Sequence, residues 1–123
     1  MATFNMNHNQ EIGKWGEQVA AEYLAKKGYT ILETNTRTPF GEIDIVACVE
    51  DVIIFVEVKA RTSHSFGLPE EALTRRKLTH MRACASYYAA KNEIDTWQCD
   101  AISVEGKPGQ TPHIEHFENV TND

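Results

Sequence analysis

The sequence has few cysteines, and their arrangement excludes the chemistry that cysteines most often serve. They are odd in number, form no CxxC pair, and stand at Cys48, Cys84 and Cys99. Disulfide frameworks use even numbers of cysteines, and zinc sites use closely spaced pairs. We therefore expect three reduced thiols that pack as small hydrophobic side chains.

The sequence also lacks an apolar run long enough to cross a membrane, an internal repeat and a low-complexity segment. Its first residues lack the basic and then apolar pattern of a secretory signal. A length of 123 residues suits one packed domain. These features predict a single cytoplasmic domain over 1–123 with no membrane contact, in which residues 1–8 form a flexible lead-in.

Basic residues are in the minority, and the formal net charge is −6. Proteins that bind nucleic-acid phosphates are usually basic, so the total argues against nucleic acid as a partner. The charge is unevenly distributed, however. Residues 59–82 include six basic and two acidic side chains, a net +4 that leaves −10 for the rest. A positive surface is therefore available, and a divalent cation would neutralise part of the acidic remainder.

Residues 41–61 are the most informative stretch. Both halves alternate apolar and other residues and are rich in β-branched side chains, which predicts two strands joined by a turn at Glu50-Asp51. Antiparallel pairing about that turn sets four pairs opposite each other, namely Val49–Val52, Val46–Phe55, Asp44–Glu57 and Glu42–Lys59. Facing carboxylates repel, a cost that is accepted mainly where a cation lies between them. Asp44, Glu57 and Lys59 are therefore a candidate site.

The second of these strands begins with apolar residues on both of its faces, so we expect it to lie centrally, with Glu57 and Lys59 buried. The remaining patterns predict a helix over 9–27, capped by Asn9 and ended by Gly28, and a helical stretch over 69–92 with a break at Thr74. They also predict strands over 29–36, 97–104 and 113–117, and loops over 37–41 and 60–68. This α-β-β-β-α-β order with a terminal strand indicates an α/β protein with a mixed sheet flanked by helices.

Glu17 lies at the edge of the apolar stripe of the first helix. Gly13 and Gly16 cost that helix about 1 kcal/mol each relative to alanine, which suggests that it approaches the sheet closely. Such an approach would bring Glu17 toward the candidate site. A boundary carboxylate without any role is an equally good interpretation of the spacing.

Carboxylate oxygens without neighbouring cysteine or histidine suit a hard cation such as Mg²⁺ or Mn²⁺. Such an ion polarises a phosphoryl oxygen and lowers the pKa of a bound water. Lys59 would then stabilise negative charge at the same phosphate, and Glu17 would be a further metal ligand. The residues predicted to hold flanking phosphates are Arg37, Arg61, Arg75, Arg76 and Lys77.

Asp44 followed by Glu57-Val58-Lys59 resembles the signature of the PD-(D/E)XK nucleases, and Glu17 is placed like the helical glutamate of the archaeal Holliday-junction resolvases in that superfamily. More closely, the chain is similar to the bacterial YraN-like family of predicted endonucleases from about Ile12 to Ala101. The matching motifs are Gly16-Glu17, Gly28-Tyr29, Asn35, Arg37, Gly41-Glu42-Ile43-Asp44-Ile45-Val46-Ala47, Phe55-Val56-Glu57-Val58-Lys59, Arg61 and Lys77. Ile43 stands where the signature's proline would be.

The resemblance implies a restriction-endonuclease-like αβββαβ core and a metal-dependent phosphodiesterase site. It assigns Glu17, Asp44, Glu57 and the backbone carbonyl of Val58 as metal ligands, with Lys59 as the catalytic lysine. The expected substrate is nucleic acid, with DNA favoured over RNA and branched or structured DNA as a candidate. A resolvase-like role would favour a homodimer.

Two alternatives use the same residues. A nuclease-fold module could bind nucleic acid without cutting it, or the domain could be structural, with Asp44, Glu57 and Lys59 as a buried ion network. A zinc site is disfavoured, because the histidines are scattered in the sequence.

Overall fold

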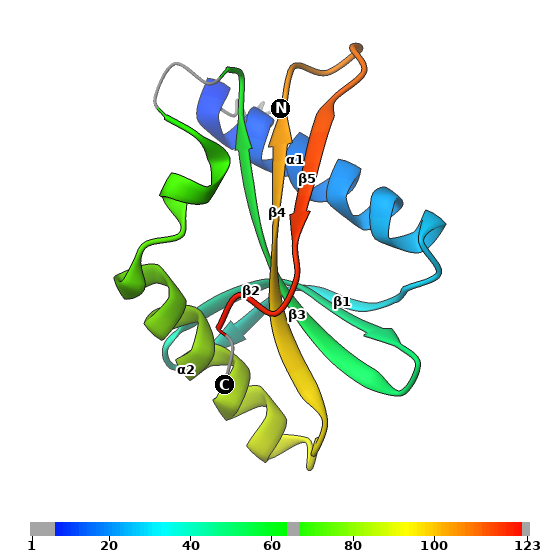
Figure 1. Cartoon of the computed structure of the whole chain (residues 1–123), viewed down its shortest axis with the longest axis vertical. Helices are drawn as coiled ribbons and strands as arrows, with labels where there is room; N and C mark the ends of the chain where they lie inside the picture. Colours follow the sequence, from blue (N-terminus) through cyan, green and yellow to red (C-terminus); the bar gives the residue numbers. More distant parts are fainter. Residues whose placement is uncertain (1–6, 64–66, 122–123) are drawn as a thin grey trace, which may run out of the picture.

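A five-stranded mixed sheet with one α-helix on each face forms the protein (Figure 1). The computed structural model describes residues 7–63 and 67–121. Its elements are α1 (His8–Lys26), β1 (Thr30–Thr38), β2 (Gly41–Val49), β3 (Val52–Arg61), the 3₁₀ turn η1 (Pro69–Ala72), α2 (Arg75–Lys91), β4 (Trp97–Glu105) and β5 (His113–Phe117). The strands lie in chain order, and only β3 and β4 run parallel. The predicted α/β class, element order and central position of β3 are confirmed.

Each face of the sheet carries its own hydrophobic cluster. On the α1 face, Ala20 and Leu24 pack with alternate strand residues such as Ile54 and Val56. On the α2 face, Met81 and Ala85 pack with the intervening residues, including Phe55. Ile54, Phe55 and Val56 are each 1% exposed. The middle of β3 is therefore covered on both sides, as its two apolar faces predict.

Helix α1 starts at His8, one residue earlier than predicted. Its N-cap is Asn7, not Asn9, and the Asn7 and Gln10 side chains form a reciprocal capping box. Such a box satisfies two of the backbone donors left free at a helix start. Asn7 and His8 thus belong to the helix end rather than to a lead-in, and residues 1–6 lie outside the described part. Gly28 follows the helix at φ 97°, where glycine is favoured, as predicted.

The loops are shorter than the sequence predicts. Arg37 and Thr38 belong to β1, which leaves Pro39 and Phe40 as the turn into β2. Ala60 and Arg61 belong to β3, because its parallel pairing with β4 continues to Glu105. The predicted 60–68 loop is thereby shortened, and its residues 64–66, including His64, lie outside the described part.

Two local predictions are confirmed, and a third is confirmed in part. Glu50 and Asp51 form the β2–β3 turn at φ 47° and 66°, the geometry of a tight hairpin turn. Thr74 caps α2, since its hydroxyl accepts the Lys77 N–H at 3.2 Å, and η1 precedes this break. Cys84 and Cys99 are buried free thiols, whereas Cys48 is partly exposed.

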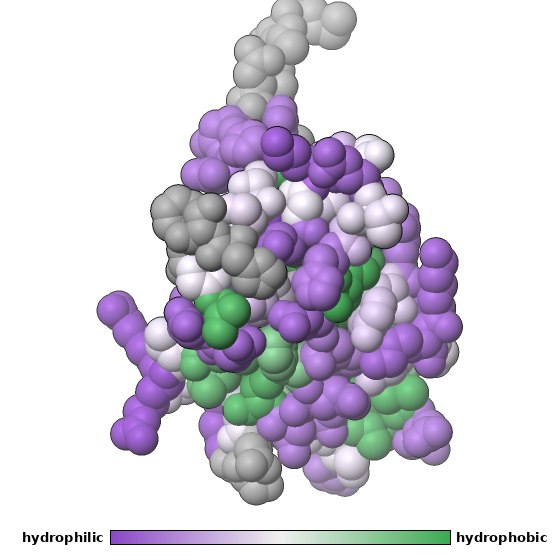
Figure 2. Space-filling model, turned by 45° about the horizontal axis from the view of Figure 1, so that its top comes forward, coloured by the Kyte–Doolittle hydropathy of each residue, from purple (hydrophilic) through white to green (hydrophobic). Residues whose placement is uncertain are grey.

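Hydrophilic side chains cover most of the face shown in Figure 2, with small apolar groups between them. Among the described residues, three large apolar side chains are about half exposed, namely Leu32, Phe40 and Leu68. Within the described residues, neither α-helix combines the length and the apolar character that a membrane crossing needs.

Candidate functional site

The sheet splits between β2 and β3, and the candidate residues lie at this split. Pairing of the two strands runs from Val49–Val52 and Val46–Phe55, as predicted, to Ile45–Val56 and then ends. β3 continues beside β4, and β2 continues beside β1 (Figure 1). The predicted pairs Asp44–Glu57 and Glu42–Lys59 are therefore wrong as ladder pairs, and Glu42 faces Arg37 of β1 instead.

Asp44 occupies the point of separation. Its Oδ2 accepts a hydrogen bond from the Val58 backbone N–H at 2.8 Å, in place of a ladder bond from β2. The pKa of Asp44 is raised to about 7, first by burial and then by the charges of Glu57, Glu17 and Glu42, while the Val58 hydrogen bond opposes the rise. Asp44 is thus a carboxyl group whose ionisation is disfavoured by the fold around it.

Glu57 lies on the α2 side of the split. Burial raises the pKa of its carboxyl group, and the charges of Lys77, His80 and Lys59 lower it, in that order. Glu57, Lys59 and Lys77 line one small cavity between β3 and the start of α2. Lys59 is exposed and Glu57 is only partly buried, contrary to the predicted burial of both, because β2 no longer flanks this end of β3.

Glu17 approaches the split from the α1 side. A Cβ atom built on Gly16 would lie 2.4 Å from the Ala60 Cβ, so the predicted close approach of α1 to the sheet is confirmed at Gly16. At Gly13 nothing lies within 4 Å, and the prediction is wrong there. Glu17 Oε1 accepts a hydrogen bond from Asn35 Nδ2 at 2.8 Å. Burial raises the pKa of Glu17, Asn35 lowers it, and the charges of Glu42 and Glu57 add to the rise.

These carboxyl groups, which we call the split cluster (Glu17, Glu42, Asp44 and Glu57), act on one another electrostatically from both sides of the sheet. Among residues 7–63 and 67–121, no three His, Cys, Asp or Glu side chains are gathered closely enough to hold a metal ion by themselves. The donor set nevertheless fits a hard divalent cation, because it offers only oxygen and its repulsions would be relieved by positive charge. Asp44 and Glu57 would hold it, with Glu17 as the further candidate.

The predicted phosphate-binding residues occupy different settings. Arg37 is exposed on β1, and Arg75, Arg76 and Lys77 are exposed at the start of α2. Arg61 is largely covered, and its Nε lies 3.8 Å from Glu105 Oε2, its partner residue across β3 and β4. The structure gathers Lys77 with Glu57 and Lys59, and it leaves Arg61 facing an acidic neighbour.

Sequence reasoning missed His80 as a site residue. Its Nε2 hydrogen-bonds the Phe40 carbonyl, and its charge lowers the pKa of Glu57. A signal was available, because Lys77 and His80 are three residues apart and so share a face of α2.

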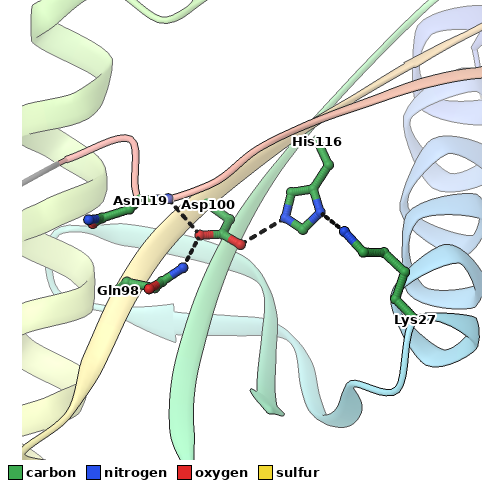
Figure 3. Close-up of polar contacts among 5 residues, drawn as sticks. All are labelled: Lys27, Gln98, Asp100, His116 and Asn119. Atoms are coloured by element: carbon green, nitrogen blue, oxygen red, sulfur yellow. Dashed lines mark hydrogen bonds and ion pairs between the residues drawn. The ribbon is translucent and has the colours of Figure 1, made fainter. Parts of the chain in front are cut away.

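A second polar cluster is centred on the buried Asp100. This Asp100 cluster (Lys27, Gln98, Asp100, His116 and Asn119) joins the C-terminal end of α1 to β4 and β5 (Figure 3). The Oδ2 of the fully buried Asp100 accepts a hydrogen bond from His116 Nε2 at 2.8 Å, and Oδ1 accepts from Gln98 Nε2 and the Asn119 N–H at 2.9 Å each. Lys27 Nζ lies 3.0 Å from His116 Nδ1. Because Lys27 can only donate, these contacts fit a neutral His116 with its proton on Nε2.

Together, the fold and the split cluster define a mixed α/β protein with a carboxylate and lysine site where its sheet opens. Residues 16–104 match the profile of the uncharacterised protein family UPF0102. Similar relatives, each described as a UPF0102 protein, come from Alkaliphilus oremlandii (46% identical, covering 91% of this chain and 98% of the relative) and Trichlorobacter lovleyi (46% identical, 91% of each). One from Syntrophomonas wolfei is 54% identical over 65% of this chain and 70% of the relative. The chain belongs to the UPF0102 family.

Proposed function

We propose that this protein is a metal-dependent endonuclease of the PD-(D/E)XK type that hydrolyses phosphodiester bonds in nucleic acid, with DNA as the substrate favoured over RNA. The split cluster is the observation that carries the proposal. A fold gains nothing from placing mutually repelling carboxyl groups at a break in its sheet, unless a cation or substrate uses them.

The residues divide the work by position. Asp44 and Glu57, with Glu17 as a third candidate and the Val58 carbonyl as the resemblance implies, would hold Mg²⁺ or Mn²⁺. When bound, such an ion supplies a more acidic water and positive charge at the phosphoryl group. Lys59 and Lys77 flank Glu57 and would bind the oxygens of the scissile phosphate.

The flanking strand would run over the exposed basic residues of α2 and β1. Arg75, Arg76 and Arg37 present their charges to solvent, whereas Arg61 faces Glu105 and would contact phosphate only beside that carboxylate. A homodimer would present two such sites to the two strands of a branched DNA.

The test is cleavage of labelled single-stranded, duplex, flapped and four-way DNA, and of the matching RNA, with Mg²⁺ or Mn²⁺. We expect cleavage of at least one DNA, and we expect Asp44→Asn, Glu57→Gln and Lys59→Met each to reduce its rate at least about a hundredfold, the scale at which removing one transition-state contact acts. Glu93→Gln, an exposed carboxylate after α2, is the matched control and should cut normally.

Binding without cleavage under either metal would contradict hydrolysis and favour the alternative of a nuclease-fold binding module. Cleavage that survives all three substitutions would assign the activity to other residues or to a contaminant.

A further inference from the structure

Phe40 is an apolar side chain in an unusual place. It lies in the two-residue turn between β1 and β2 and is 52% exposed. Turns at a protein surface are mostly built from polar residues, glycine and proline, so an exposed ring departs from the usual composition of a turn. The turn lies beside α2 and therefore near the split cluster (Figure 1).

The ring is presented from a rigid turn. The Thr38 hydroxyl donates to the Gly41 carbonyl at 2.8 Å and accepts the Phe40 N–H at 3.1 Å. The ring meets Tyr87 of α2 edge-on, with centroids 6.3 Å apart and planes at 68°. Phe40 thus needs little further ordering before it binds a ligand.

The same turn contacts the proposed active site through His80. His80 bonds the Phe40 carbonyl and also acts on Glu57. A Cβ atom on Gly41 would lie 2.7 Å from the His80 ring, so glycine lets the turn sit directly on α2. Beyond His80, the surface of α2 forms an open hollow lined by Arg75, Arg76 and Lys77. The turn that carries Phe40 therefore adjoins His80, and His80 itself lines the hollow that these three cations form.

We propose that Phe40 stacks on an unpaired nucleobase of the bound strand, so that the site takes single-stranded, gapped or branched nucleic acid in preference to intact duplex. The inference rests on the proposed function and names its substrate class. An aromatic face stacks on a base of any identity, and bases inside a duplex already stack on each other. The neighbouring cations bind the phosphates on either side of that base. The apolar ring and the charged side chains thus bind the base and the backbone of the same strand.

The experiment measures binding in EDTA, where no metal supports cleavage. Fluorescence anisotropy compares a short oligothymidine, an abasic strand of the same length and the corresponding duplex. We expect the wild-type protein to bind oligothymidine about tenfold more tightly than the abasic strand, the effect of one base stacked on an aromatic ring. Phe40→Ala should bind the two strands about equally, and Phe40→Trp should restore the preference.

Leu32→Ala is the matched control. Leu32 is 49% exposed on the same strand, and roughly 20 Å separate it from the turn along β1. It should keep the wild-type preference. Phe40→Ala leaves the backbone bond to His80 in place, and a thermal melt that matches wild type confirms its fold.

Equal wild-type affinity for the two strands would overturn the inference, since it would show a surface that takes negative charge from any source, acidic peptides included. A preference for duplex, or a preference that Phe40→Ala retains, would overturn it as well. A Phe40-dependent preference without cleavage would support base stacking by Phe40 and contradict the proposed hydrolysis. Cleavage without that preference would support the hydrolysis and contradict base stacking by Phe40.

Discussion

The described residues include two clusters around carboxyl groups, and the two clusters are opposite in character. Asp100 is fully buried, and both of its oxygens accept hydrogen bonds. Asp44 is half-buried and accepts the Val58 N–H, yet burial and then the neighbouring carboxylates raise its pKa to about 7. The first arrangement is what a stable fold requires of a buried acid. The second carries an electrostatic cost that folding does not explain, and this contrast separates scaffold from site.

Helix α1 connects the two clusters. Glu17 of this helix belongs to the split cluster. Lys27, which caps the end of the helix, bonds His116 of the Asp100 cluster. The close contact of Gly16 with Ala60 fixes the helix on the sheet directly beside Glu17. The following predictions test the contrast, in order of decreasing expected effect.

Asp100→Ala should lower the free energy of unfolding by about 3 kcal/mol, because it leaves His116, Gln98 and the Asn119 N–H without their acceptor. Urea unfolding followed by circular dichroism measures the change. The exposed Asp95→Ala is the control and should stay within about 0.5 kcal/mol of wild type. A similar small change for Asp100→Ala would show that the Asp100 cluster is not structural.

Gly16→Ala should destabilise the protein by about 2 kcal/mol, since the new methyl group overlaps Ala60. Gly13→Ala is its matched partner in the same helix. Nothing lies near its Cβ position, so it should stabilise the protein by up to about 1 kcal/mol through helix propensity. Urea unfolding of the two variants should therefore give shifts of opposite sign, and equal shifts would contradict the close approach.

Asp44→Asn should stabilise the metal-free protein above neutral pH. The folded-state pKa of Asp44, about 7, lies above the ordinary value of 3.8, so the folded state favours the protonated acid. The stability gained by that protonation is fully present below about pH 4 and is lost as pH rises through 7. Asparagine keeps an acceptor for Val58 and does not titrate.

The expected gain over wild type is on the order of 1 kcal/mol at pH 8 after allowance for solvent screening, and it should shrink toward zero near pH 4. Urea unfolding in EDTA across this range measures it. A loss of stability at pH 8 would instead support the alternative in which Asp44, Glu57 and Lys59 form a stabilising ion network.

Lys27→Met should cost about 0.5–1 kcal/mol, the smallest effect of the series. Lys27 is exposed, and methionine keeps an unbranched apolar side chain but removes the ammonium, which bonds His116 and lies over the Tyr23 and Tyr29 rings. Lys26→Met, one residue earlier and exposed, should change nothing measurable in the same unfolding experiment. Equal free energies of unfolding for the two variants would show that Lys27 does not stabilise the Asp100 cluster.

The sequence predicts the fold well where the determinants are local. Alternation of apolar residues gives the strands, Glu50-Asp51 gives the hairpin turn, and Thr74 gives the start of α2. The error at the start of α1 was avoidable, because Asn7 and Gln10 have the spacing of a capping box.

The site is only partly predictable, because it depends on where a regular pattern stops. Alternation extended to Lys59 implies continued pairing and burial, whereas the β2 residues before Ile45 have no partner in β3. The two strands separate where the Asp44 side chain, and not the β2 backbone, accepts the Val58 N–H. Strand periodicity does not predict such a replacement. The Asp100 cluster was missed for a related reason, since Lys27, Asp100 and His116 are brought together only by the packing of three elements.

The separation of β2 from β3 gives the sheet an interior edge. Edges of a sheet present backbone groups that need partners, and at this one the Val58 N–H is satisfied by the carboxylate of Asp44. The Asp44 side chain thus satisfies a backbone donor of β3 and also belongs to the site where the substrate would bind. Alanine at position 44 would remove both roles together, so only a substitution that keeps the acceptor, such as asparagine, separates the chemistry of this residue from its part in holding the sheet open.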